Sequence, residues 1–420
     1  MYNTTKKLSG TVELKGDKSI SHRLLMIASL INDKSVIKNL STGLDVLTTM
    51  ECLQQCNIHI SYTKDTATVH GGALKSPKRP LNCKNSGTTA RMMIGLLSGQ
   101  KINSSFKGDT SLMKRPMKRI IEPLRAMSIN IKHNNNMLPI SIDSDDVTPL
   151  NYNGYTKSAQ VKSSLMLASL GSNKYSSITY NQNTRDHTEK ILQYLKFNIL
   201  IQNPIKIKKS KMNEGFSLTV PGDISNASFI IGASLIIPGS EIIIKNVLYN
   251  KTRLGLIDAL LKMGANIQII KKRHTQNPEM CCDIIVKYTP KLHGITIRGD
   301  EIITMIDEIP ILSIIATQAK GQTVFENAAE LRYKESNRLS LIYNNLLSMG
   351  ANIIESQDGL TINGNKKLHY TTIIHENDHR IAMSFEVLNL LINNKMDNSY
   401  IGVIKISFPE FYTLIEGLIQ

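Results

Sequence analysis

The sequence contains no tryptophan, and aromatic residues make up only 5% of its 420 residues. Aliphatic side chains must therefore build the core, and a hydrophobic content of 41% is ample for one. The chain is long enough for two or three domains of ordinary size. We therefore expect a globular protein with several aliphatic cores.

Cysteine and long apolar runs are also scarce. The five cysteines form no CxxC pair, and their odd number does not suggest a disulfide framework, so we expect buried thiols in a reducing compartment. The longest apolar run, 229–237, is well short of the ~20 residues of a membrane helix. The first residues lack the apolar segment of a signal peptide. These absences predict a soluble cytoplasmic protein with no membrane segment.

The formal net charge is +16, which suits nucleic acid, anionic lipid or small anionic substrates as partners. Much of the excess is lysine, and the chain is also rich in isoleucine and asparagine. Genome composition alone produces such a bias. The bulk charge is therefore weak evidence for a polyanionic partner.

A short pattern recurs along the chain: an apolar residue, a small or polar one, an apolar one, Asn or His, and Ile. Each copy follows an amphipathic stretch, and Gly or Asn at its second position suits a left-handed helix C-cap. An alternating apolar strand then begins. We expect a helix-to-strand junction at each copy, roughly every 70 residues. The copies lie at 56–60, 127–131, 195–199, 263–267 and 349–353.

Between these junctions, small polar residues begin long apolar helices. The expected helices are 19–30, 86–97, 158–170, 225–237, 307–319 and 378–391. The sixth unit lacks a strand, which the alternating segment Thr11–Leu14 can supply. Gly-Asp begins both halves, at 16 and 222. The sequence thus predicts an α/β protein with two domains of three repeats, 16–222 and 223–420, with residues 1–15 joining the second.

The segment 332–338 offers the most chemistry, because three cations surround one carboxylate. If it is helical, Lys334 and Arg338 share a face and Glu335 lies near Arg338. Such a group can hold an anion with two cations and keep a carboxylate for proton transfer. A solvated, ion-paired helix face is an equally good interpretation of this segment alone.

The segment 16–23 places cations at a predicted helix start. Ser19 can cap the helix, and Lys18 and Arg23 flank its N-terminus, which is itself an anion site. The spacing of a phosphate-binding Walker loop is missing. In the segment 85–91, Gly87 lets the backbone approach a ligand closely, although an ordinary capped helix explains it as well.

Other segments are individually less specific. Arg115 precedes a proline, so its backbone should be extended, and a solvated loop arginine is the alternative. The segment 158–163 is a polar helix start. His187 can be a general base, but a capping or solvent-facing histidine is the commoner case. Asp307 begins a very apolar helix and is either an N-cap or a partly buried base.

Cations recur at or beside these helix starts. If the repeats pack symmetrically, the starts converge on one cleft between the domains. Converging helix dipoles and cations should bind a substrate with several phosphate or carboxylate groups. The cations are Lys18, Arg91, Arg185, Lys334 and Arg380.

At these segments the sequence resembles the 5-enolpyruvylshikimate-3-phosphate synthase family. The matching strings, in the family's order, are GDKSISHR, NSGTTAR, GDTSLMKRPM, SAQVKS, TRDHTEK, MIDEIP, ELRYKESNR and DHRIAM. The resemblance implies a two-domain inverse α/β barrel-like fold in which each domain has three βαβαββ units. It also implies that the N-terminal strand belongs to the C-terminal domain and that the active site lies in the interdomain cleft.

The resemblance further implies that the 5-hydroxyl of shikimate 3-phosphate attacks phosphoenolpyruvate and that phosphate is then lost from a tetrahedral intermediate. It implies no cofactor, no metal, and a monomer that acts on small molecules without nucleic acid. The catalytic residues it implies are Lys18, Asp307 and Glu335, with Asp307 taking the hydroxyl proton and Glu335 acting at the methylene carbon. The implied shikimate-3-phosphate residues are Lys18, Ser19, Arg23, Ser158, Ala159, Gln160, Arg185, Asp307 and Lys334. The implied phosphoenolpyruvate residues are Lys18, Gly87, Arg115, Gln160, Arg338 and Arg380.

The sequence departs from the family pattern at three positions. Asn337 replaces a common Asp, which we expect to alter a structural hydrogen bond more than the chemistry. Ala159 replaces a common Ser, so a contact there must come from the backbone. Ile406 stands where some members carry a phosphoenolpyruvate-binding Lys, and whether Lys405 substitutes for it is left open.

Two other functions are alternatives for this sequence. A UDP-N-acetylglucosamine enolpyruvyl transferase resembles this pattern, but that family carries a loop cysteine near Arg115, and no cysteine lies between Cys83 and Cys281. A basic nucleic-acid-binding protein would place aromatic rings among its cations to stack bases. Tyr333 is the one aromatic residue next to the cations of 332–338.

Overall fold

The computed structural model describes residues 6–272, 277–393 and 395–420. By its internal contacts the described chain forms two compact units. The N-terminal unit comprises 15–220 together with 277–279, and the C-terminal unit comprises 6–14, 221–272 and 280–420. Residues 277–279 were predicted to belong to the C-terminal domain, but their contacts lie with the N-terminal unit.

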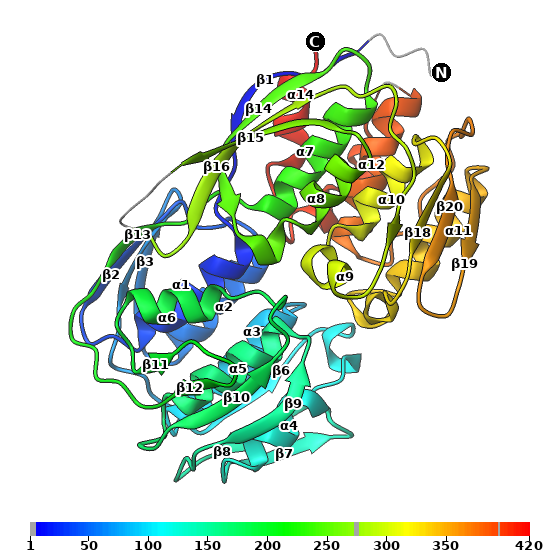
Figure 1. Cartoon of the computed structure of the whole chain (residues 1–420). Helices are drawn as coiled ribbons and strands as arrows, with labels where there is room; N and C mark the ends of the chain where they lie inside the picture. The colour runs from blue at the N-terminus through cyan, green and yellow to red at the C-terminus, as the bar shows by residue number, and fades with distance from the viewer. Residues whose placement is uncertain (1–5, 273–276, 394) are drawn as a thin grey trace. The chain divides into compact units, whose positions relative to one another are not determined.

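The N-terminal unit contains three four-stranded sheets built on one plan (Figure 1). In each sheet the first two strands are parallel, and the remaining neighbours are antiparallel. The sheets, in spatial order, are β13 (Ser217–Thr219), β2 (Lys34–Lys38), β4 (Thr66–His70) and β3 (His59–Thr63); β5 (Leu81–Asn82), β6 (Ser104–Lys107), β8 (Met137–Asp143) and β7 (Asn130–Asn134); and β9 (Asn151–Thr156), β10 (Ser176–Tyr180), β12 (Ile205–Ile207) and β11 (Ile199–Leu200).

Helices of this unit pack between the sheets and supply its core. They are α1 (Lys18–Ser29), α2 (Leu44–Gln55), α3 (Gly87–Gly99), the short η1 (Leu112–Lys114), α4 (Lys118–Arg125), α5 (Ala159–Ser169) and α6 (His187–Tyr194). Helices α3 and α5 lie side by side (Figure 1). Gly95 permits this approach, since a Cβ there would lie 2.2 Å from the Ser164 carbonyl oxygen.

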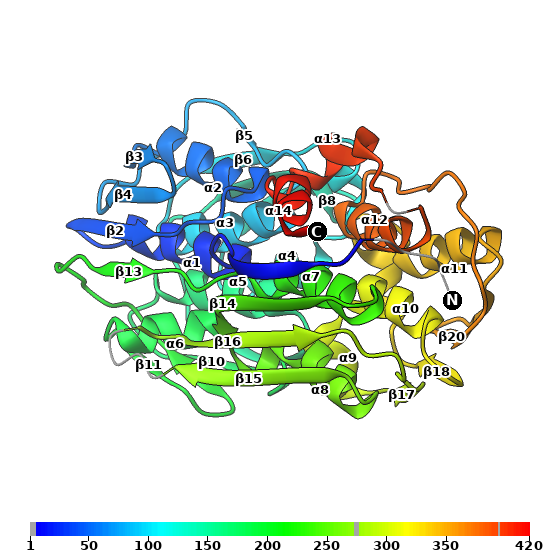
Figure 2. The ribbon, with the colours of Figure 1, turned by 90° about the horizontal axis from the view of Figure 1, so that it is seen from above.

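The C-terminal unit repeats the plan in two sheets. Their strands, in spatial order, are β1 (Ser9–Glu13), β14 (Glu241–Tyr249), β16 (Met280–Lys287) and β15 (Asn266–Lys272); and β17 (Thr296–Ile297), β18 (Gln322–Phe325), β20 (Leu360–Asn363) and β19 (Asn352–Glu355). Figure 2 shows β1 beside β14, with β16 and β15 following. The predicted α/β fold is therefore confirmed, including the repeated order of strands and helices.

The helices of the C-terminal unit include three almost wholly buried ones that contact each other: α7 (Ile224–Ile236), α10 (Ile309–Thr317) and α12 (His379–Asn393). The others are η2 (Lys251–Arg253), α8 (Gly255–Lys262), α9 (Asp300–Met305), η3 (Ala329–Tyr333), α11 (Arg338–Ser348), η4 (Asn398–Tyr400), α13 (Ile401–Ile404) and α14 (Phe411–Leu418). Within the described residues, no helix has both the length and the apolar character needed to cross a bilayer.

All five predicted helix-to-strand junctions are confirmed. In each, a helix ends just before the pattern and a strand begins at its fourth or fifth residue. The second residue of every copy has a positive φ, as a left-handed C-cap requires. The values are 69° at Asn57, 67° at Ser128, 60° at Lys196, 85° at Gly264 and 88° at Gly350.

The prediction of which repeat the N-terminal strand joins was wrong. The strand was expected to complete the sixth repeat, but β1 pairs in parallel with β14, a strand of the fourth repeat. After β20, the described residues form helices and no further named strand. The end of the chain instead meets the N-terminal segment at a single bridge between Leu8 and Ile419.

Candidate active site

Three helices of the N-terminal unit begin at the predicted motifs. Ser86 caps α3 and Ser158 caps α5, each accepting a backbone N–H of the first turn, at 3.2 and 3.5 Å. Helix α1 differs from expectation, because Asp17 rather than Ser19 is its N-cap, with its Oδ1 3.0 Å from the Ile20 amide nitrogen. Each start presents first-turn amides and a positive dipole end, which favour an anion.

Lys18 lies at the first turn of α1 with a carboxylate beside it. Its Nζ is 3.0 Å from Oδ2 of Asp45 on α2, and the two side chains are 17% and 13% exposed. The ammonium group is thus partly desolvated but still open to solvent. Sequence reasoning missed Asp45, because no local motif marks it.

Arg23 is a buried arginine whose guanidinium is held by hydrogen bonds to three groups. It is 2% exposed. Its guanidinium donates to Ser163 Oγ at 2.7 Å, to Thr188 Oγ1 at 2.8 Å and to the Ser19 carbonyl at 2.8 Å. Arg23 therefore joins α1, α5 and α6, and its charge is held in one place.

Two guanidinium groups lie over the first residue of α3. A Cβ on Gly87 would be 2.9 Å from an Arg91 nitrogen and 3.3 Å from an Arg115 nitrogen. Arg91 donates to Gln160 Oε1 at 2.7 Å, and Arg115 donates to Asn85 Oδ1 at 2.7 Å. Arg91 was predicted as a cation at a helix start but not as a binding residue.

The backbone of Arg115 is extended, with φ −80° and ψ 135°, as the following proline predicts. The alternative of a solvated loop arginine is wrong, since the residue is only 7% exposed. Ala159 is the first residue of α5 and offers a backbone N–H but no polar side-chain atom. Its neighbour Gln160 donates to Thr88 Oγ1 at 2.9 Å.

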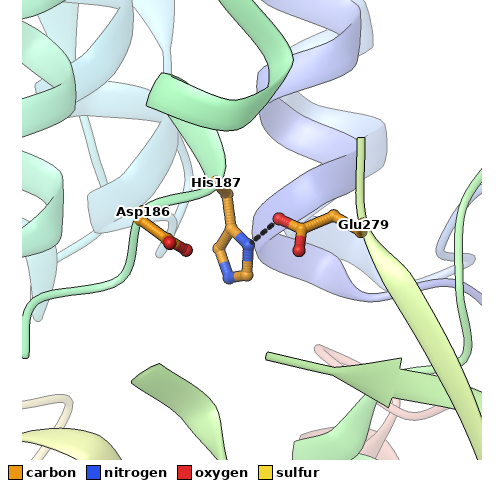
Figure 3. Close-up of side chains that lie close together, drawn as sticks. All are labelled: Asp186, His187 and Glu279. Carbon is orange, nitrogen blue, oxygen red and sulfur yellow. Dashed lines mark hydrogen bonds and ion pairs between the residues drawn. The ribbon is translucent and has the colours of Figure 1, made fainter. Parts of the chain in front are cut away.

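The start of α6 connects to α1 through Arg185, whose guanidinium donates to Ser19 Oγ at 3.3 Å. His187 follows two residues later and is wholly buried, so it is not solvent-facing as the sequence suggested. Its Nδ1 lies 2.6 Å from Oε1 of Glu279. Figure 3 shows the two side chains facing each other. This pairing leaves His187 as a structural group within the unit and does not present it as a general base.

In the C-terminal unit, the segment 332–338 is not one helix. Helix η3 ends at Tyr333, Lys334 has φ −81° and ψ −148°, and α11 begins at Arg338. The expected common helical face of Lys334 and Arg338 is therefore wrong. The expected contact of Glu335 with Arg338 is confirmed, with Oε2 and the guanidinium 2.5 Å apart. Asn337 is the N-cap of α11, and its Oδ1 accepts a hydrogen bond from the Ser340 amide at 3.3 Å.

Arg338 is 1% exposed and is held by three carboxylates. Its Nε is 2.8 Å from Asp378, and its terminal nitrogens are 3.2 Å from Asp307 and 2.5 Å from Glu335. Burial lowers the pKa of Arg338, but the three negative charges outweigh it and raise that pKa above its ordinary value. Burial likewise raises the pKa of Asp378, and Arg338 outweighs it and lowers that pKa. Both shifts favour the charged forms of Arg338 and Asp378.

Asp307 lies between α9 and α10 and is not an N-cap, because Glu308 occupies the cap position of α10 without a side-chain capping bond. Besides Arg338, the Asp307 carboxylate has Lys334 Nζ at 3.5 Å and Arg380 at 4.0 Å. The Arg380 guanidinium also donates to the Asp307 carbonyl at 3.0 Å. A half-buried carboxylate thus lies among three cations, an arrangement suited to proton transfer next to bound anions.

The predicted residues therefore form two sets, one in each unit. The set in the N-terminal unit is Lys18, Ser19, Arg23, Gly87, Arg115, Ser158, Ala159, Gln160 and Arg185. The set in the C-terminal unit is Asp307, Lys334, Glu335, Arg338 and Arg380. Lys405 is exposed at the end of α13.

The described residues include one group of metal-ligand type, formed by Asp186, His187 and Glu279. The ammonium of Lys190 lies 3.3 Å from Asp186 and 3.4 Å from Glu279 and so already supplies a positive charge there. Both carboxylates of this group are thus already paired with a lysine ammonium. The described cysteines are all buried, and none of them is in a disulfide.

Comparison with known proteins decides the family. Residues 2–415 match the family model of EPSP synthase (3-phosphoshikimate 1-carboxyvinyltransferase). The chain belongs to the EPSP synthase family. The 3-phosphoshikimate 1-carboxyvinyltransferase of Syntrophomonas wolfei is 41% identical over 98% of both chains. That of Petrotoga mobilis is 40% identical over 99% of this chain and 98% of its own.

Solved structures agree with this assignment. The EPSP synthase of Acinetobacter baumannii superimposes with a TM-score of 0.84 and 33% identity, over 100% of this chain and 98% of that one. The enolpyruvyl transferase NikO of Streptomyces tendae has a TM-score of 0.78 at 14% identity, over 100% of this chain and 97% of its own. The latter shows a shared fold alone.

Proposed function

We propose that this chain transfers the enolpyruvyl group of phosphoenolpyruvate to the 5-hydroxyl of shikimate 3-phosphate, a step of the shikimate pathway to aromatic amino acids. The observation that carries the proposal is the family match over residues 2–415. The chemistry of the site supports it, because both substrates are anions and both sets of residues are rich in cations.

We assign the N-terminal set mainly to binding. Shikimate 3-phosphate is held by the start of α1 with Ser19 and Arg23, by the start of α5 at 158–160, and by Arg185. The hydroxyl of Ser19 and the guanidinium of Arg185 are already in contact, at 3.3 Å, so one anionic oxygen can reach both. Phosphoenolpyruvate is held by Lys18, Gly87, Arg115 and Gln160. The two guanidinium groups over Gly87 and the open ammonium of Lys18 support that assignment.

We assign the C-terminal set to charge stabilisation and proton transfer. Arg338 and Arg380 bind phosphoenolpyruvate, and Lys334 contacts shikimate 3-phosphate beside Asp307. The supporting observation is that Asp307 and Glu335 both contact the buried Arg338, at 3.2 and 2.5 Å. Two carboxylates on one fixed guanidinium can serve two different proton transfers.

The reaction then balances in two steps. In the first step, Asp307 takes the proton of the 5-hydroxyl while the hydroxyl oxygen bonds to C2 of phosphoenolpyruvate. The electrons of the double bond take a proton at C3 from the protonated Glu335. In the resulting tetrahedral intermediate, Glu335 regains a proton from C3, the double bond re-forms, and the C2–O bond to phosphate breaks. The proton held by Asp307 passes to the departing phosphate, so both carboxyl groups return to their starting states. The cations stabilise the charge on the leaving phosphate. These steps use no metal and no cofactor.

We further propose that the chain acts as a monomer in the cytoplasm, on small molecules and without nucleic acid. The local charge balance supports the last point. Lys18, Lys334, Arg338 and Arg380 each lie beside an acidic side chain, which weakens the continuous positive field that attracts a long polyanion.

Phosphate release from phosphoenolpyruvate by the purified chain tests the function. We expect release with shikimate 3-phosphate and none with phosphoenolpyruvate alone or with UDP-N-acetylglucosamine. Release that required the sugar nucleotide would assign the chain the sister activity. Release with neither acceptor would refute the proposal.

A further inference from the structure

Glu279 is the last residue of the short segment 277–279, which belongs to the N-terminal unit although β16, directly after it, belongs to the C-terminal unit. It immediately precedes β16 and is 1% exposed. Its carboxylate contacts the buried His187, with Oε1 2.6 Å from Nδ1 (Figure 3). A buried carboxylate must be paired to remain buried, so this contact fixes both residues.

His187 is the first residue of α6, and this helix start lacks an ordinary cap. Asp186 occupies the N-cap position but makes no side-chain capping hydrogen bond. Such a bond is typically worth about 1 kcal/mol, and an uncapped first turn frays more easily. Glu279 therefore stabilises the start of α6, whose own N-cap residue makes no side-chain capping hydrogen bond.

Side chains of the proposed substrate site are positioned by residues at this same start of α6. Arg185 immediately precedes the cap residue and donates to Ser19 Oγ at 3.3 Å. Thr188 Oγ1 accepts a hydrogen bond from Arg23 at 2.8 Å. A displacement of the α6 start would thus move both the Arg185 guanidinium and an acceptor of Arg23.

We infer that Glu279 is a positioning residue for shikimate 3-phosphate, acting through His187 on the start of α6 and so on Arg185. The inference rests on the proposed function, because it takes Arg185 as a substrate ligand. Glu279 itself does not touch the substrate. Lys190, 3.4 Å from Glu279 Oε2, balances its charge.

The test compares three variants of the full chain. Glu279→Ala removes both the charge and the hydrogen bond to His187. Glu279→Gln keeps the size and a hydrogen-bonding oxygen and is the safer variant for folding. Asp283→Asn is the matched control, because Asp283 lies on β16 and pairs with Lys272 at 2.7 Å. It perturbs the neighbouring strand without contacting α6.

The readout is the Kd for shikimate 3-phosphate from calorimetry, together with kcat and the KM for phosphoenolpyruvate. We expect Glu279→Ala to raise the Kd at least about tenfold, equal to ~1.4 kcal/mol. We expect Glu279→Gln to raise it about threefold and Asp283→Asn to leave it unchanged, with kcat and the phosphoenolpyruvate KM within about twofold in all.

The positioning role alone would be overturned if the wild type binds shikimate 3-phosphate normally and Glu279→Gln has the same Kd. Glu279→Ala should then also have the same Kd, provided that it folds. Equal losses for both substrates would also overturn it, since they would indicate a general structural defect. Loss of shikimate-3-phosphate affinity on EDTA treatment, restored by zinc, would overturn it in favour of a metal site. A wild type that neither binds shikimate 3-phosphate nor releases phosphate would refute the proposed function as well.

Discussion

Replacing Glu335 with Gln separates proton transfer from binding. Glu335 is partly exposed, 24% by its side chain, while its Oε2 is 2.5 Å from the buried Arg338. Gln keeps the shape and can still accept the arginine N–H. Arg338 also retains Asp378 at 2.8 Å and Asp307 at 3.2 Å, so its position should not change.

The expected loss follows from the role assigned to Glu335. A positioned general acid or base contributes about 10²- to 10⁴-fold to rate, which is roughly 3–5 kcal/mol of barrier. We therefore expect kcat to fall at least about 100-fold in Glu335→Gln. The Kd for shikimate 3-phosphate should change less than about threefold. The effect on folding free energy should stay below about 1 kcal/mol, because partly exposed ion pairs contribute little.

Glu355→Gln is the matched control. Glu355 also pairs with an arginine, Arg332, at 2.7 Å, and its side chain is 19% exposed. It lies on β19, outside the proposed catalytic set, so kcat should stay within about twofold. The assay is phosphate release at saturating substrates, with calorimetry for the Kd. A Glu335→Gln variant that kept kcat within tenfold of the wild type would refute a proton-transfer role for Glu335.

Three further changes test other parts of the account. Lys18→Ala should raise the KM for phosphoenolpyruvate more than about tenfold, or ~1.4 kcal/mol, because it removes a solvent-accessible ammonium group at the start of α1. A change confined to the affinity for shikimate 3-phosphate would contradict the assignment. Gly87→Ala should raise the same KM, because its Cβ would lie 2.9 Å from the Arg91 guanidinium, and an unchanged KM would place the ligand elsewhere. Burial raises the pKa of Glu386 from an ordinary 4.5 to about 8. The folded chain thus binds this proton more tightly than the unfolded chain, so stability should fall as pH rises from about 4.5 to 8, by up to about 5 kcal/mol. Glu386→Gln should remove that fall in denaturant titrations across this range, and an identical pH dependence in variant and wild type would count against it.

The repeated order of helices and strands was predictable because it is encoded locally. Each junction carries a residue able to adopt a positive φ next to an alternating strand, and even Ser128 and Lys196 take that conformation where Gly would be expected. The caps Ser86 and Ser158 were predictable for the same reason. Asp17 was missed as a cap because Ser19, two residues later, fits the same local preference.

The partners of the site residues were not predictable, because they are remote in sequence. Lys18 pairs with Asp45, His187 with Glu279 and Arg338 with Asp378, and only the fold brings these charges together. The prediction that the segment 332–338 is one helix was wrong for a related reason. Its charges have helical spacing, but η3 ends at Tyr333 and α11 begins only at Arg338, whose three carboxylate partners include two that are remote in sequence. The roles of the individual site residues stay predictions.

The fate of the bridging oxygen of phosphoenolpyruvate tests the central claim most directly. Substrate carrying heavy oxygen between C2 and phosphorus is incubated with the chain and shikimate 3-phosphate, and phosphorus NMR follows the label. Enolpyruvyl transfer breaks the C–O bond, so the account predicts that the label appears in inorganic phosphate, and only when shikimate 3-phosphate is present. Unlabelled phosphate, or labelled phosphate formed without the acceptor, would contradict it.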